Sequence, residues 1–321
     1  MTALLEMKER LKQLYGKYSL YIMVGIRFIT ALVVFTLINQ NVGFMTKLKN
    51  PAISLMLALF CAFLPQNVII FCAAALILLH LYAASLEFAL MVMAVFLILL
   101  LLYYRFAPKH SFVLLLTPVA FVLKVPYLIP LVMGLIATPV AAVPVSFGII
   151  VYYLLYYVKQ SAVTLTGTEI DSTVHKYVYV MEHALKRPEI YLMIVAFTVT
   201  IITVYLIRRL SVDYAWTIAI FSGCLIDVFI LLTGDFILDV SLGIAGLFLG
   251  SVISIIITWL LQFFVFSVDY SRTEYVQFQD DEYYYYVKAV PKMSITQRDK
   301  TVKRINPQRK VREERRRNTM K

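Results

Sequence analysis

Residues 222–250 read SGCLIDVFILLTGDFILDVSLGIAGLFLG, an apolar segment interrupted by three aspartates and followed by regularly spaced glycines. Crossing the hydrocarbon core of a bilayer takes about 20 mainly apolar residues in a helix. The apolar runs on the two sides of the sequence TGD, at residues 215–232 and 236–266, come near or exceed that length. The segment therefore predicts two successive membrane helices.

The whole chain has the composition of a membrane protein. It has 321 residues and a mean hydropathy of +0.80, with 61% hydrophobic and 15% charged residues. A soluble domain of this length could not shield so much apolar surface from water. We therefore predict an all-α polytopic membrane protein.

About ten membrane segments are expected, within a helical bundle over residues 20–267. Short or proline-broken segments either place non-helical backbone against protein or a cavity, or form thin or tilted helices. Residues 125–158 are too long for one span and are expected to split near Thr138 and Pro139. The segments are 20–39, 51–64, 67–84, 88–104, 111–123, the two halves of 125–158, 190–207, 215–232 and 236–266.

Basic residues predict the orientation, because cytoplasmic loops carry an excess of Lys and Arg. If the amphipathic N-terminus, residues 1–19, lies in the cytoplasm, Arg105, Arg208 and Arg209 also fall on the cytoplasmic side. The C-terminal tail also falls inside, whereas Lys47, Lys49 and Lys124 are exceptions on the outside. We expect a multi-pass protein of the plasma membrane with both termini in the cytoplasm.

The one sizeable external loop, residues 159–189, carries apolar residues at helical spacing. Thr168 and Asp171 resemble a capping box, so an amphipathic helix is expected that lies on the outer membrane surface or covers the bundle. His175 and His183 lack the further ligands that a metal site needs and are interpreted as solvated side chains.

Six ionisable residues fall within or close to the expected spans: Arg27, His80, Glu87, Asp227, Asp235 and Asp239. Such residues usually face the interior of a bundle or a cavity. We hypothesise that Arg27 and Asp227 neutralise each other across the bundle. A proton or ion pathway through the three aspartates is the alternative, but Asp235 is expected in a turn and Asp239 near the outer boundary.

Glycines suggest close helix packing near Asp227. Gly246 and Gly250 form a small-xxx-small pair, which lets helix backbones approach closely, and Gly243 precedes them. Together with Gly223 and Asp227, this pattern resembles the rod-shape determining protein D family. It is similar in the same way to the substrate subunits of energy-coupling-factor transporters, which are also small membrane bundles.

Two longer stretches resemble another family. They are YSRTEYVQFQDDEYYYYVKAVP, residues 270–291, and VPYLIPLVMGLIATPVAAVPVSFG, residues 125–148. They are similar to multi-spanning, permease-like membrane proteins of clostridial bacteria. This resemblance spans the chain, but it implies no established activity and no binding residues.

The sequence has no motif that would make the chain an enzyme. It contains no P-loop, no Gly-rich dinucleotide loop, no H-E-x-x-H and no nucleophile elbow. No cofactor is expected, and an ATP-driven transporter would need a separate ATPase subunit. The cysteines Cys61, Cys72 and Cys224 lie in apolar runs without metal-ligand spacing and are interpreted as small core residues.

Residues 268–291 predict a small cytoplasmic β-hairpin, because aromatic and β-branched residues flank Asp280 and Asp281. In its second strand, Tyr283 and Tyr285 would face one side and Tyr284 the other. The alternative is a kinase substrate, which we disfavour because a packed tyrosine is poorly accessible.

The last 30 residues, 292–321, carry +9 of the net charge of +11 and few large apolar side chains, so we expect a disordered tail. Its basic cluster is expected to bind anionic lipid headgroups or an acidic protein, with nucleic acid the less expected partner. The cluster comprises Arg309, Lys310, Arg312, Arg315, Arg316 and Arg317.

Two functions agree with these features. The first is a transport protein or permease-type subunit of unknown substrate. The second is a non-catalytic membrane scaffold of a cell-envelope assembly or division complex. A polar cavity at the bilayer midplane, lined by Arg27, Asp227 or the proline-rich break, would favour transport, and a filled bundle would favour the scaffold.

Overall fold

The computed structural model describes residues 2–108, 110–165, 187–210, 212–240, 243–266, 274–279 and 282–289. The chain divides into two units. One is Leu11–Phe266, which is helical wherever regular structure is described, and the other combines Met1–Arg10 with Ser267–Lys321 and holds the two strands. Residues 166–186, which make up most of the loop predicted to be external, and the basic tail, residues 292–321, lie outside the described residues.

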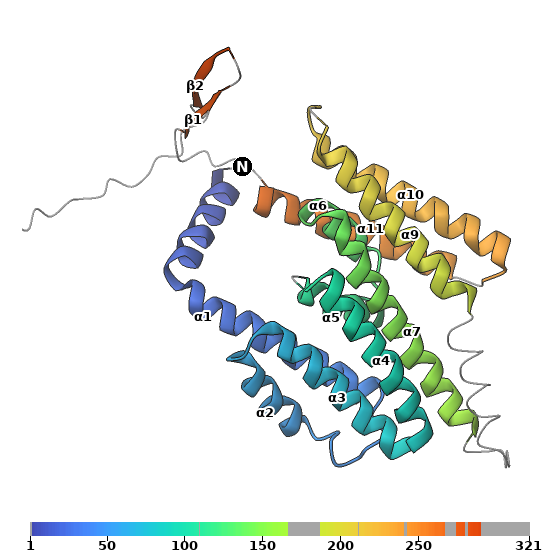
Figure 1. Cartoon of the computed structure of the whole chain (residues 1–321). Helices are drawn as coiled ribbons and strands as arrows, with labels where there is room; N and C mark the ends of the chain where they lie inside the picture. The colour runs from blue at the N-terminus through green and yellow to red at the C-terminus, as the bar shows by residue number, and fades with distance from the viewer. Residues whose placement is uncertain are drawn as a thin grey trace, which may run out of the picture. The chain divides into compact units, whose positions relative to one another are not determined.

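The described ranges contain ten α-helices and one short 3-10 helix (Figure 1). They are α1 (Thr2–Asn41), α2 (Pro51–Ala62), α3 (Gln66–Ala84), α4 (Leu86–Phe106), α5 (Ser111–Val122), α6 (Leu128–Ile136), η1 (Pro139–Ala141), α7 (Ala142–Leu165), α9 (Pro188–Arg208), α10 (Ala215–Leu238) and α11 (Ile244–Phe266). The prediction of an all-α multi-pass membrane protein is confirmed at this level.

Seven of these helices are long and apolar enough to cross a membrane. They are α1, α3, α4, α7, α9, α10 and α11. The 12-residue helices α2 and α5 reach about 18 Å each, and α6, with nine residues, is shorter still, against a hydrocarbon core of about 30 Å. Seven of the ten expected segments thus have the length of a full span within the described part of the chain, and the other three are short helices.

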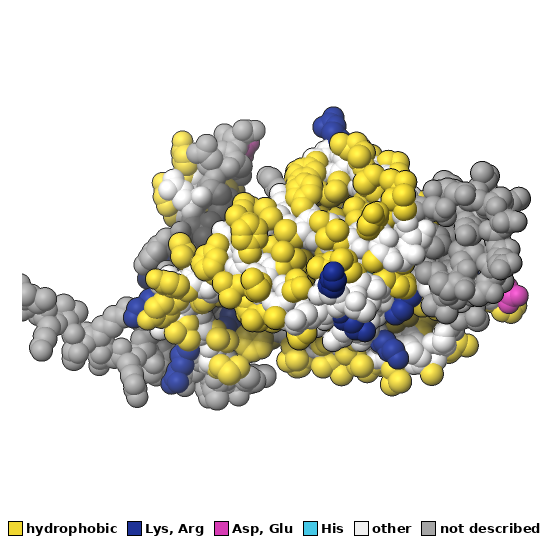
Figure 2. Space-filling model, turned by 90° about the horizontal axis from the view of Figure 1, so that it is seen from below, with side chains coloured by type: hydrophobic (Ala, Val, Ile, Leu, Met, Phe, Trp, Pro, Cys, Tyr) yellow, Lys and Arg dark blue, Asp and Glu magenta, His cyan; other side chains and the backbone are white. Residues whose placement is uncertain are grey.

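The surface agrees with a bilayer environment. Figure 2 shows one face on which hydrophobic side chains dominate and basic side chains are scattered. Large apolar residues are exposed on several candidate spans, among them Leu97 on α4 and Phe229 and Phe236 on α10. Lipid tails can cover such side chains without the cost of hydrating them.

Two predicted boundaries shift in the structure. Helix α1 runs through the expected boundary at residue 19 and is only kinked at Tyr18, where the backbone leaves helical geometry. Helix α7 continues to Leu165, so the link to α9 starts later than residue 159.

The predicted turn around Asp235 is wrong. Asp235 lies inside α10, which continues to Leu238 because apolar residues follow it without a helix breaker. Asp239 ends the helix with φ of 52°, a left-handed conformation that Asp tolerates better than most residues.

The predicted helix break near Thr138 and Pro139 is confirmed. Helix α6 ends at Ile136, and η1 and α7 follow. Arg208 of α9 donates hydrogen bonds to the carbonyls of Leu135 and Ala137, the latter at 2.8 Å. These bonds satisfy carbonyls that the end of α6 would leave without partners in an apolar region.

The second unit contains β1 (Glu274–Gln279) and β2 (Tyr284–Ala289), which pair antiparallel with Phe278 opposite Tyr285. The rings of Tyr283 and Tyr285 lie 6.2 Å apart, centroid to centroid, so they share one side. The tyrosines of this strand are exposed within the described residues. Asp280 and Asp281, where the turn was predicted, lie outside the description.

Candidate functional site

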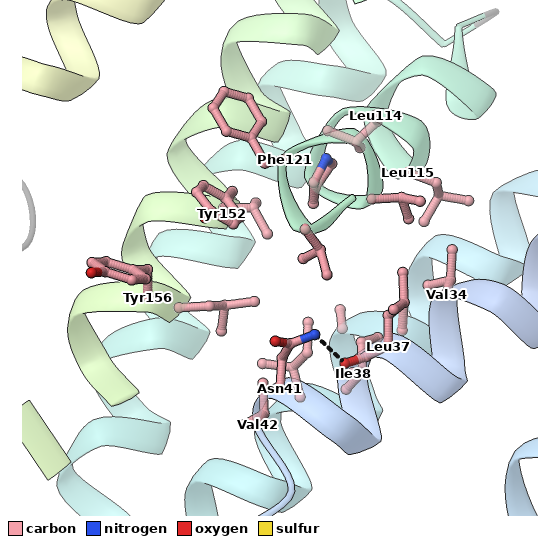
Figure 3. Close-up of a pocket in the computed structure, with 18 of the residues that line it drawn as sticks. Val34, Leu37, Ile38, Asn41, Val42, Leu114, Leu115, Phe121, Tyr152 and Tyr156 are labelled. Atoms are coloured by element: carbon pink, nitrogen blue, oxygen red, sulfur yellow. Dashed lines mark hydrogen bonds between the residues drawn. The ribbon is translucent and has the colours of Figure 1, made fainter. Parts of the chain in front are cut away.

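A partly open cavity of about 700 Å³ lies between α1, α3, α4, α5 and α7. Figure 3 shows side chains of α1, α5 and α7 that converge on this space, among them Leu37, Leu114 and Tyr152. Ala73 and Ala74 of α3 and Leu100 of α4 complete the apolar lining. The volume falls within the range of about 300–1,000 Å³ that is common for small-molecule sites.

Helices α5 and α7 are held side by side along one wall of the cavity. A Cβ atom on Gly148 would lie 2.5 Å from the Cβ of Thr117, so only glycine permits this approach. Four residues further along both helices, the rings of Phe121 and Tyr152 stack with centroids 4.6 Å apart. Because both contacts have the same offset of 31 residues, α5 and α7 run parallel, and the chain at Lys124 comes level with α7 about one turn before Lys159.

One end of the cavity is polar. Asn41 lies at the end of α1, Lys124 follows the end of α5, and Tyr156, Lys159 and Gln160 belong to the last turns of α7. The side chains of Lys124 and Lys159 are exposed, and neither has a hydrogen-bond or ion-pair partner within the described ranges. The site is thus an apolar body with two available cations at one end.

A buried polar network holds the loop after α1 against α3. The imidazole of His80, 0% exposed, accepts a hydrogen bond from the amide of Met45 at 3.2 Å. Its other nitrogen lies 2.6 Å from Oδ1 of Asn39, whose amide donates to the carbonyl of Leu48 and to Oγ of Ser54. His80 therefore has a structural role beside the cavity.

The expected ion pair between Arg27 and Asp227 is not formed. Arg27 donates to the carbonyl of Leu64 at 3.3 Å, and Asp227, 2% exposed, accepts from the hydroxyl of Thr200 at 3.1 Å. Each of the two side chains hydrogen-bonds to a neutral group instead. Neither residue lines the cavity.

The three aspartates do not form a continuous buried path. Asp227 is buried, Asp235 is half-buried, and Asp239 is exposed at the end of α10. Asp227 and Asp239 lie about 18 Å apart along the helix axis. Of Glu87, the structure describes only the helical backbone.

Only one of the three glycines predicted to pack helices lies at a close approach. A Cβ on Gly250 would meet the ring of Tyr127 at 2.9 Å. No described atom lies within 4 Å of the same position on Gly243 or Gly246, so that part of the packing prediction is wrong for the described neighbours.

Asp227 offers a direct test of these assignments. Asp227→Asn keeps an oxygen that can accept from Thr200 and removes any cost of burying a charge, so we expect the free energy of unfolding to change by less than about 1 kcal/mol. Asp227→Leu removes the acceptor and should cost about 1–3 kcal/mol. Thermal unfolding in detergent measures both. Equal damage from the two variants would contradict the assignment and favour an essential charge.

The sequence predicted Lys124 as a charge at a membrane boundary and as an exception to the positive-inside rule, but it did not predict a role for Lys159 or Asn39, or the cavity itself. The described residues contain no group of three side chains suited to a metal ion, and the three cysteines are free thiols. Comparison of the chain with protein-family models, curated proteins and solved structures gives no match.

Proposed function

We propose that the protein is a membrane transport protein or permease-type subunit that takes an amphiphilic molecule into the cavity between α1, α3, α4, α5 and α7. The observation that carries this proposal is the cavity's division into an apolar body and a polar, basic end. An amphiphile matches both parts, because its apolar portion gains by burial and its head keeps polar contacts.

A hydrophilic substrate fits less well. Such a substrate would call for polar groups along the path at the bilayer midplane, near Arg27, Asp227 or the proline-rich break. Arg27 and Asp227 instead bond to neighbouring groups outside the cavity. An amphiphile dissolved in the bilayer can reach a partly open cavity without crossing water.

Several finer features belong to the same proposal. The charge distribution supports cytoplasmic termini in a plasma membrane, which puts the strand unit and the basic tail in the cytoplasm. The resemblance to permease-like clostridial proteins points the same way. The sequence lacks a nucleotide-binding motif, so a separate ATPase would have to drive any ATP-dependent cycle.

A scaffold role in envelope assembly or division is the second candidate. It is favoured by the exposed tyrosines of β2, which offer an aromatic surface to a protein partner. Affinity purification of the full chain in mild detergent distinguishes the candidates by the partner recovered, because an ATPase supports transport and an envelope-synthesis enzyme supports the scaffold.

Filling the cavity tests the transport proposal. Ala74 lines the cavity, so Ala74→Trp should fill its apolar body and reduce the bound amphiphile at least tenfold, a loss of about 1.4 kcal/mol in binding free energy. Native mass spectrometry of the purified protein measures the bound molecules.

Ala75→Trp is the matched control. Ala75 is the next residue of α3, and its side chain is exposed outside the cavity lining. This variant should retain the wild-type level of bound amphiphile. A folded Ala74→Trp protein that binds as much as Ala75→Trp would refute the proposed site.

A further inference from the structure

We propose that the cavity's occupant is an anionic phospholipid of the surrounding bilayer, whose acidic head is held by Lys124 and Lys159. This inference rests on the proposed function and names the ligand class for the same cavity. The apolar chain of the lipid would lie between α1, α5 and α7, where Figure 3 shows a converging set of aliphatic and aromatic side chains.

The two lysines reach the same end of the cavity from different elements. Lys124 follows α5 with φ of 60°, a left-handed residue that turns the chain away from the helix axis. Lys159 lies on α7 seven residues after Tyr152 and three after Tyr156, which places the three side chains on one stripe of the helix. This stripe leads from the aromatic wall to the cation.

The charge at this end is uncompensated. Among the described residues that line the cavity there is no acidic side chain, whereas Lys124 and Lys159 both belong to the lining. Charges beside an apolar, low-dielectric body attract a counter-ion more strongly than charges in open water. A carboxylate or phosphate head is therefore favoured over a neutral or cationic one.

The loop after α1 carries two further cations, which are close in sequence to the cavity-lining Asn41 and Val42 but do not line the cavity themselves. Lys47 and Lys49 lie in the segment that immediately follows Asn41, and the amide of Asn39 fixes that segment through the carbonyl of Leu48. Under the predicted orientation, Lys47, Lys49 and Lys124 are the exceptions to the positive-inside rule. Binding of an anionic lipid head would explain why these three lysines lie on the outer side, where the positive-inside rule disfavours basic residues.

The test is lipid selectivity of the full-length protein in detergent, measured by native mass spectrometry. Phosphatidylglycerol is the anionic probe and phosphatidylcholine is the zwitterionic probe. We expect the wild type to prefer phosphatidylglycerol. The double variant Lys124→Gln with Lys159→Gln should lose this preference by a factor of about five for each lysine removed. Binding of phosphatidylcholine should stay unchanged.

Two controls accompany the double variant. Lys124→Arg with Lys159→Arg keeps both charges and should keep the preference. Lys17→Gln removes a cation that does not line the cavity and should also keep it. Retention of the preference in the double glutamine variant would overturn the inference.

Two further outcomes separate this inference from the proposed function. If Ala74→Trp abolishes binding of both lipids but the double glutamine variant keeps the preference for phosphatidylglycerol, the cavity is supported as the binding site and the role of the two lysines is refuted. If Ala74→Trp leaves both lipids bound, the cavity itself is refuted. Inorganic phosphate should not displace phosphatidylglycerol, because it cannot occupy the apolar part of the cavity. Displacement would identify a site for free phosphate and would contradict the assignment of a phospholipid as the ligand.

Discussion

Alanine at Gly134 or at Gly223 is expected to destabilise the bundle by about 1–3 kcal/mol, the usual cost of overpacking a filled interior. Val204 of α9 is 0% exposed and lies between these two glycines, which belong to α6 and α10. A Cβ on Gly223 would lie 2.2 Å from Cγ2 of Val204, and a Cβ on Gly134 would lie 2.6 Å from its Cβ. The valine cannot retreat from one glycine without approaching the other.

A double-mutant cycle sharpens this expectation. Val204→Ala removes the Cγ2 atom that blocks Gly223, so it should relieve the damage of Gly223→Ala. It leaves the Cβ that blocks Gly134, where the carbonyl of Ile201 also lies 3.2 Å away, so Gly134→Ala should gain little relief. The interaction free energy should therefore be large for one pair and small for the other.

Thermal unfolding in detergent, followed by circular dichroism, measures these changes. Gly246→Ala is the matched control, because no described atom lies within 4 Å of the added methyl group. It should leave stability unchanged or raise it by up to about 1 kcal/mol, since alanine favours a helix over glycine. Equal effects at Gly223 and Gly246 would show that the close packing around Val204 does not limit stability.

The features that the sequence predicted well depend on local properties of the chain. Long apolar runs identify helices such as α9 and α10 because the bilayer demands a fixed length. The break between α6 and α7 was predictable because Pro139 has no amide hydrogen and disfavours a helical residue before it. The turn at Asp235 was misplaced because a single charged residue at a helix end does not stop a helix that apolar residues continue.

The contacts of polar residues could not be predicted in the same way. Arg27 and Asp227 were expected to pair because opposite charges attract, but the fold brings the carbonyl of Leu64 to Arg27 and the hydroxyl of Thr200 to Asp227. Neither partner has a distinctive sequence signal, since every residue carries a carbonyl and threonine is common in spans. The cavity has five helices as walls, so no single segment could reveal it.

Loss of the imidazole at position 80 is expected to be the most damaging polar substitution in the described bundle. A backbone amide can only donate, so the contact between Met45 N–H and Nδ1 assigns the ring hydrogen to Nε2, which then donates to Asn39. His80→Leu leaves the Met45 amide and the Asn39 oxygen without these partners. At about 1–3 kcal/mol for each buried group, the total approaches the stability of many proteins.

The network should respond as one unit. Asn39→Leu alone leaves the imidazole and the carbonyl of Leu48 without partners, so the double variant His80→Leu with Asn39→Leu should cost less than the sum of the two single changes. Thr30→Val is the control, because the exposed Thr30 hydroxyl bonds only to a carbonyl of its own helix. Unfolding in detergent measures the four variants, and strictly additive losses would show that the groups act independently.

Because this network fixes the segment that carries Lys47 and Lys49, folded variants with a weakened network should also bind phosphatidylglycerol less tightly, with phosphatidylcholine binding unchanged.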